Sequence, residues 1–222
     1  TLYGLLNLAV NIKTAKECFK QSKYQETIDI CNKILIVDSK EIEALKLIAK
    51  SFLATRNIDN ARLYFNKALT LKPDDLESIK DIGNTFKAVG DVNTARIYYK
   101  KAIGIDSSYA PALTNLGSIE VSKGDKQEGL SLLIKATESA PQLAPAWLNL
   151  ANGYFQLGET QLAEVSIRKS IEINPCLFNS HLLLGSILVG QKKLQEAEIS
   201  IRKSIELNPS FFQAHLSLGA IL

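Results

Sequence analysis

The sequence predicts an all-α protein, a solenoid of stacked antiparallel helix pairs. Proline or serine recurs every 34 residues without insertion or deletion, at Ser39, Pro73, Ser107, Pro141, Pro175 and Pro209. Small residues recur at the same step, at Ala15, Ala49, Gly83, Gly117, Ala151, Gly185 and Gly219. A fixed period of this length is typical of stacked supersecondary units, which offer an extended binding surface rather than an enzyme pocket.

Each period divides into two amphipathic helices, as residues 76–109 illustrate. The first carries apolar or small residues at helical spacing, at Ile79, Ile82, Gly83 and Phe86. Gly90-Asp91 interrupts this pattern, because glycine tolerates the left-handed backbone of a tight turn. The helical spacing then resumes at Val92, Ala95, Tyr99 and Ala102. Proline near the end of most periods predicts the turn before the next helix.

Residues 144–177 hold the fullest set of these positions, at Trp147, Leu150, Ala151, Tyr154, Gly158, Ala163, Ile167, Ser170 and Pro175. This pattern resembles the tetratricopeptide repeat (TPR) family. The resemblance covers six repeats, 8–41, 42–75, 76–109, 110–143, 144–177 and 178–211, and a partial one, 212–222. It implies a right-handed superhelix with the first helices along its concave face, so we expect residues 1–222 to form a single TPR solenoid.

Two repeats depart from the pattern. Repeat 8–41 has polar residues at usually apolar or small positions, Asn11, Thr14 and Thr27, which suits an atypical N-terminal capping repeat. Repeat 110–143 has Glu120 where an aromatic residue is expected and Gly129 where alanine is expected. A half-buried carboxylate beside an unfilled space should make this the weakest joint of the stack. The alternative is that Glu120 reaches solvent.

Charge and hydropathy exclude several kinds of partner. The formal net charge of +3 is too small to predict nucleic-acid binding, and no apolar run reaches the ~18–20 residues of a membrane span. Residues 1–109 carry 17 Lys/Arg and 13 Asp/Glu, whereas residues 110–222 carry 9 and 10. The basic half favours acidic partners, the alternative being scattered solvating charge. We expect a cytoplasmic location, although a chain that begins at Thr1 and lacks Met reads as a fragment.

No motif predicts catalysis or a cofactor. The sequence has no Gly-rich phosphate loop and no His-Glu-x-x-His pair. His181 and His215 lie one repeat apart and could bind a metal, but no third ligand accompanies them, so a packing role is favoured. Cys18 and Cys31 should face each other across one helix pair. We expect packed free thiols, with oxidation to a disulfide as the alternative.

The resemblance implies that ligand contacts come from the first helices, on the side away from the packing stripe. In the first three repeats these positions are mostly basic: Lys13, Lys16, Lys20, Lys46, Lys50, Lys80, Asn84 and Lys87, with Glu43, Glu77 and Asp81 between them. In later repeats they are asparagine, serine and apolar residues: Asn115, Ser118, Leu148, Asn149, Asn152, Phe155, Leu182, Ser186, Val189 and Leu216. The asparagines resemble those lining the TPR region of O-linked N-acetylglucosamine transferases.

These observations predict a non-catalytic scaffold that binds a protein or peptide segment in its groove. Lysines would hold carboxylates of a partner, and asparagine amides can bond both the N–H and the C=O of an extended backbone. The alternative is the substrate-recruiting arm of a longer modifying enzyme, such as a glycosyltransferase. A further expectation is a homodimer through the uncapped C-terminal helix, whose apolar face holds Leu216, Leu218 and Leu222.

Overall fold

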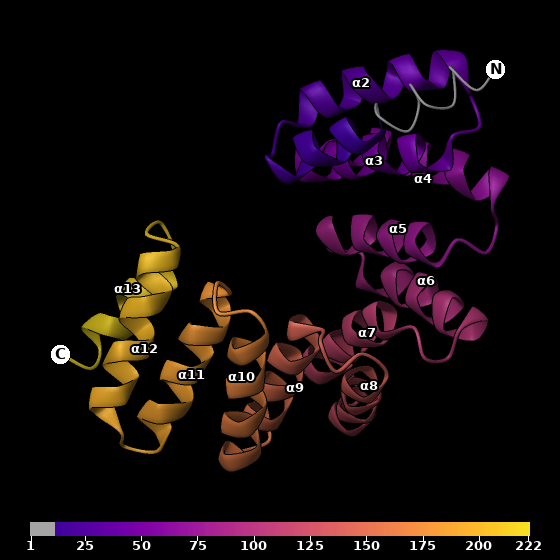
Figure 1. Ribbon diagram of the computed structural model, residues 1–222. Helices are drawn as coiled ribbons and strands as arrows, with labels where there is room; N and C mark the ends of the chain where they lie inside the picture. The colour runs from indigo at the N-terminus through magenta and orange to yellow at the C-terminus, as the bar shows by residue number, and fades with distance from the viewer. Residues whose placement is uncertain (1–11) are drawn as a thin grey trace. The chain divides into compact units, whose positions relative to one another are not determined.

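The computed structural model of the protein describes residues 12–222, and these form helices and turns without a strand. Residues 12–20 are helical and precede α2 (Tyr24–Val37) (Figure 1). The following pairs are α3 (Ile42–Ala54) with α4 (Ile58–Leu71), α5 (Leu76–Ala88) with α6 (Val92–Ile105), α7 (Ala110–Lys123) with α8 (Lys126–Ser139), α9 (Ala144–Gln156) with α10 (Thr160–Ile173), and α11 (Phe178–Gly190) with α12 (Leu194–Leu207). A last helix, α13 (Phe212–Gly219), forms the first helix of the partial repeat. The all-α fold predicted from the 34-residue step is confirmed.

The chain divides into two compact units, Thr1–Ser107 and Ser108–Leu222. Within each unit, a first helix packs on the second helix of its own repeat, and that second helix packs on the next first helix. First helices of neighbouring repeats also touch, α3 against α5 in one unit, and α9 against both α7 and α11 in the other. A single continuous solenoid over residues 1–222 stays a prediction.

The turn between paired helices depends on one left-handed residue in most repeats. Gly90 and Gly158 have φ of 84° and 82° there, a conformation that glycine adopts without steric cost. Arg56 and Lys192 hold the equivalent positions with φ of 60° and 63°. After Gly90, the Asp91 carboxylate accepts a hydrogen bond from the Thr94 N–H (3.0 Å) and caps α6.

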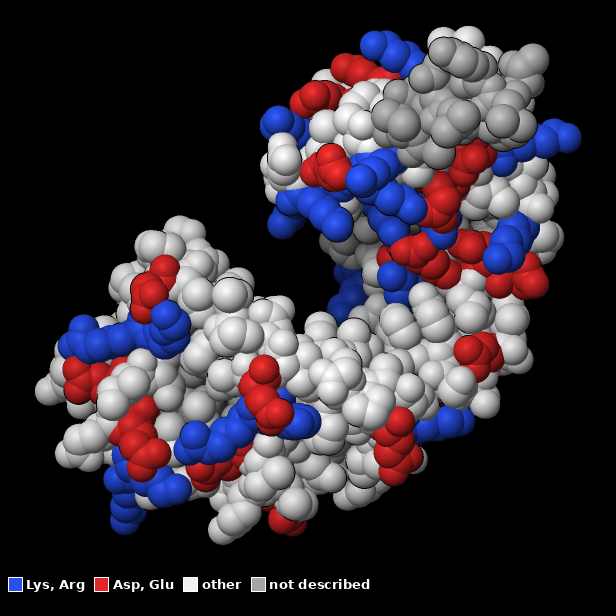
Figure 2. Space-filling view, viewed as in Figure 1, with Lys and Arg blue, Asp and Glu red and all other residues white. Residues whose placement is uncertain are grey.

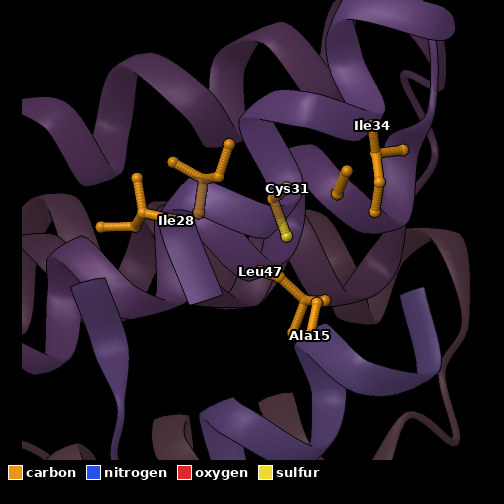
Figure 3. Close-up of a cluster of buried hydrophobic side chains, with 7 residues drawn as sticks. Ala15, Ile28, Cys31, Ile34 and Leu47 are labelled. Carbon is orange, nitrogen blue, oxygen red and sulfur yellow. The ribbon is translucent and has the colours of Figure 1, made fainter. Parts of the chain in front are cut away.

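The core of the first repeats is largely aliphatic and includes the Cys31 thiol. Ile28, Cys31 and Ile34 of α2 pack with Ala15 and Leu47 from the first helices on either side (Figure 3). Burial raises the pKa of the Cys31 thiol to about 12, so the thiol stays protonated. Cys18 and Cys31 are both buried and free, as the packing interpretation predicted.

Glycines permit close contact between paired helices. A Cβ on Gly83 would lie 2.6 Å from the Tyr99 ring, so the fully buried tyrosine occupies the space that a side chain would need. The expected void beside Gly129 is wrong for a related reason. A Cβ there would lie 2.6 Å from the backbone N of Val121, because α7 and α8 approach closely and leave no space. Glu120 does not reach solvent, since it is 5% exposed.

Within residues 12–222, no helix has both the length and the hydrophobicity needed to span a membrane.

Candidate peptide-binding surfaces

Lys46 is the most deeply buried lysine of the described residues. It lies on the predicted binding face of α3, yet it is only 6% exposed. Its ammonium bonds the Glu43 carboxylate at 2.8 Å and the Glu77 carboxylate of α5, and it lies 3.8 Å from Asp75. Three carboxylates therefore surround one buried cation, and Lys46 is not free to receive an acidic ligand.

Two more predicted lysines join the same network across repeat boundaries. Lys16 bonds Glu43 at 3.0 Å, and Lys50 bonds Glu77. Each pair joins one first helix to the next and is separated by 27 residues, so the repeat period itself produces the contact. We call Lys16, Glu43, Lys46, Lys50, Asp75 and Glu77 the first-helix ion network. Figure 2 shows the result as adjoining blue and red side chains over this unit.

The pKa values follow from this pairing. Partial burial raises the pKa of Glu77, but hydrogen bonds and charge from Lys46 and Lys50 outweigh it and lower the pKa to about 2. The pKa of Glu43 is lowered in the same way by Lys46 and Lys16, against its own burial. For Lys46, burial lowers the pKa, yet the bonds to Glu43 and Glu77 raise it overall. Glu43, Lys46 and Glu77 are therefore all charged at neutral pH.

Lys80 and Asn84 are engaged inside the same unit. Lys80 pairs with Asp81 Oδ1 at 2.7 Å, and the Asn84 amide donates to the same oxygen at 2.9 Å. The Tyr99 hydroxyl donates to Asn84 Oδ1 at 2.7 Å. Burial, and the charge of Asp81 to a smaller extent, raise the pKa of Tyr99, which keeps the hydroxyl a donor. Asn84 thus connects the binding face to the core.

The remaining lysines of this face are exposed. Lys13, Lys20 and Lys87 make no ion pair with any residue in the described range 12–222. These three, rather than Lys16, Lys46, Lys50 and Lys80, are the cations open to a ligand.

The first helices of the other unit present a face without charge. α9 and α11 contain no Lys, Arg, Asp or Glu. Asn149 and Asn152 are half-buried on α9, and their amides make no hydrogen bond with a described residue. Leu148, Phe155 and Val189 pack partly into the core beside them. In Figure 2 this unit shows broad white areas between its charged side chains. Asn115 is half-buried on α7.

Each of the two histidines bonds a nearby backbone carbonyl. The Nε2 atoms of His181 and His215 each lie 2.8 Å from a proline carbonyl six residues earlier, Pro175 and Pro209. Trp147 Nε1 donates to the Pro141 carbonyl in the same way. Since a carbonyl only accepts, Nε2 carries the proton in both histidines. Among the described residues, no three His, Cys, Asp or Glu side chains gather as a metal site.

Sequence reasoning missed the ion network, although the signal was present. Glu43 and Glu77 lie between lysines in the sequence, and each stands 27 residues after a lysine of the preceding first helix. In a 34-residue stack, this offset places the start of one first helix beside the middle of the previous one. The carboxylates therefore complete the lysine set.

The family follows from these repeats and from sequence comparison. The tetratricopeptide repeat profile matches residues 42–75, 81–109, 110–143, 144–175 and 178–211, well over half of the chain. The chain belongs to the tetratricopeptide repeat family. Three matched segments have the boundaries predicted from the sequence, and repeat 8–41, predicted to be atypical, is not among them. The comparison with curated proteins gave no match.

Solved structures with the same fold are distant in sequence. The Cut9–Hcn1 hetero-tetramer of the APC/C matches 97% of this chain with a TM-score of 0.85 at 18% identity. The match covers 42% of that chain, so this protein spans less than half its length. A TPR protein from Parabacteroides merdae matches with a TM-score of 0.74 at 18% identity, over 97% of this chain and 84% of its own. A TPR protein of Thermus thermophilus matches 81% of this chain and 98% of its own, with a TM-score of 0.68 at 21% identity. These likenesses concern the fold alone.

Proposed function

We propose that this protein is an interaction scaffold that binds an extended, largely uncharged peptide segment on the first-helix face of its second unit. The observation that carries the proposal is the state of Asn149 and Asn152, whose amides have no hydrogen-bond partner among the described residues. Partly buried amides lose water when a ligand covers them, so they need partners within that ligand. An extended backbone offers the N–H and C=O groups that suit an amide.

The residues around these amides supply the rest of such a site. Phe155 on α9 and Val189 on α11 are half-buried and apolar, so each offers contact area to a side chain of the ligand. Since α9 and α11 carry no ionic residue, the face favours a segment without charge at its centre. Asn115, on the neighbouring α7, would extend the same row.

An acidic partner is a second, narrower proposal for the first unit. Its contacts would come from Lys13, Lys20 and Lys87, which are exposed and make no ion pair with a described residue. Lys16, Lys46, Lys50 and Lys80 contribute only if a ligand carboxylate displaces one of the chain's own. Charge complementarity of this kind mainly changes association rates and their salt dependence. The recruiting-arm role and the homodimer stay predictions.

A selected peptide tests the main proposal. Twelve-residue peptides displayed on phage are selected on the whole chain, and the best binder is titrated calorimetrically. The double substitution Asn149→Ala with Asn152→Ala removes two bonds of about 1 kcal/mol each, so the dissociation constant should rise by at least about tenfold. Asn66→Ala, an exposed asparagine on the second helix α4, is the matched control and should leave affinity unchanged. The proposal is refuted if every selected peptide binds the double variant as tightly as the natural chain.

A further inference from the structure

A second surface of the first unit lies mainly on the second helices α2 and α4. It is separate from the first-helix face to which we assign peptide binding. A hollow of about 490 Å³ is lined by Leu35 and Ile36 of α2, Leu45 of α3, and Tyr64 and Lys67 of α4. An adjoining hollow of about 230 Å³ shares Leu45 and Lys67. It extends the depression along α4 to Thr70 and Leu71. The surface is therefore concave and has an apolar floor.

Its rim exposes aliphatic side chains to an unusual degree. Ile36 is 84% exposed, and its neighbour Val37 is 71% exposed. The 34-residue step provides an internal comparison, because the positions equivalent to Ile36 in the last three full repeats hold Glu138, Glu172 and Glu206. Those repeats place a solvated carboxylate where this one places an isoleucine. A single exposed aliphatic residue is ordinary, but Ile36 and Leu71, which is 39% exposed, both line this depression and indicate a contact surface.

The charge of Lys67 is also uncompensated. At the equivalent positions, Lys169 bonds Glu172 at 3.0 Å and Lys203 bonds Glu206 at 2.7 Å, each within one helical turn. The residue three positions after Lys67 is Thr70, whose hydroxyl donates to the Asn66 carbonyl instead. The Lys67 ammonium lies over the Tyr64 ring, 4.5 Å from its centroid, and has no ion pair among the described residues. Repeats 8–41 and 42–75 therefore each lack, at Ile36 and Thr70, the glutamate that would make this surface polar and neutral.

We propose that this depression, which we call the α2–α4 hollow, binds a partner segment that presents an aliphatic or aromatic side chain next to an Asp or Glu. The apolar side chain enters between Leu35, Leu45 and Tyr64, and Ile36 covers it from the rim. The adjacent carboxylate pairs with Lys67, whose position over Tyr64 already restricts the ammonium. Asn32 lines the same hollow, and its amide has no bonded partner in the described chain, so it can bond the segment's backbone.

The repeat comparison also supplies the variants. Ile36→Glu and Thr70→Glu give repeats 8–41 and 42–75 the glutamate that repeats 144–177 and 178–211 carry at this position, where the fold accommodates it. A glutamate at position 70 would pair with Lys67 as Glu172 pairs with Lys169. Gly104→Glu is the matched control, because it makes the same charge change at the same repeat position, and a Cβ there meets nothing within 4 Å.

A phage library of twelve-residue peptides is first depleted of peptides that bind the Ile36→Glu, Thr70→Glu double variant. The remaining peptides are then selected for binding to the natural chain. The expected consensus is an apolar residue beside Asp or Glu. By fluorescence anisotropy, Ile36→Glu should weaken such a peptide by about tenfold or more through lost apolar contact. Thr70→Glu should weaken it by about fivefold through competition for Lys67. Gly104→Glu should have no effect.

Three results would overturn the proposal: no peptide that depends on Ile36 and Thr70, a consensus without an acidic residue, or equal weakening by Gly104→Glu. Circular dichroism of all variants checks that each is folded. Because Asn149 and Asn152 lie outside this hollow, a failure here leaves the proposed function untouched.

Discussion

Replacing Lys46 by methionine tests whether the first-helix ion network is structural. Methionine keeps a long unbranched stem and removes only the charge. Glu43, Asp75 and Glu77 would then lie together without their shared cation. Breaking a fully buried ion pair costs about 3–5 kcal/mol. Because the Glu43 and Glu77 side chains are 42% and 37% exposed, water and salt screen part of this cost. We therefore expect a loss of about 2 kcal/mol at neutral pH.

The effect should depend on pH with a definite sign. The pKa of Glu77 is about 2 in the folded protein, below its ordinary value of 4.5. A depressed carboxylate pKa contributes stability that is complete above pH 4.5 and is lost as the pH falls toward 2. The Lys46→Met variant lacks much of this contribution at any pH. The stability difference between the two proteins should therefore shrink by more than half between pH 7 and about pH 3.

Urea unfolding followed by circular dichroism at both pH values measures this difference. Lys101→Met is the control, since Lys101 is exposed and makes no ion pair with a described residue. It should leave the unfolding midpoint of the protein unchanged. If Lys46→Met destabilises the protein equally at pH 7 and pH 3, the lysine stabilises the fold through its hydrocarbon stem, and the ionic explanation is wrong.

Three backbone substitutions test the glycine and turn geometry. Gly129→Ala should lower stability by about 2 kcal/mol because the new Cβ would press on the backbone of Val121. Gly104→Ala, in open space on a helix, should raise stability by about 0.5–1 kcal/mol, and an equal loss at both sites in urea unfolding would contradict the packing account. Lys192→Gly should stabilise the protein by about 0.5 kcal/mol, because it relieves a left-handed residue, φ 63°, at some cost in unfolded-state entropy. An unchanged or lower thermal midpoint for that variant would argue against strain at this turn.

The repeat period was sufficient to predict the fold and its local details. The break at Gly90-Asp91 predicted the turn between α5 and α6, because a left-handed glycine and a capping carboxylate are local properties of the chain. The packing role of His181 also followed, since its position is the one that Trp147 fills one repeat earlier. These predictions succeed because each concerns contacts between residues only a few positions apart in the sequence.

Gly129 shows where this reasoning fails. Comparison with alanine at the equivalent position suggested a void, whereas α7 and α8 approach until Val121 fills it. A missing side chain can be compensated by a shift of a whole helix, and a sequence pattern does not record the distance between helices. The low stability predicted for repeat 110–143 stays a prediction.

By itself, the sequence determined the helices, the turns and the stacking order, because hydrophobic period and glycine placement act over a few residues. Only the tertiary structure decided which charges are available to a partner. Lys46 and Lys13 look alike in the sequence, yet one is buried among three carboxylates and the other is exposed. The difference arises from side chains of neighbouring repeats, which meet only after the helices have stacked.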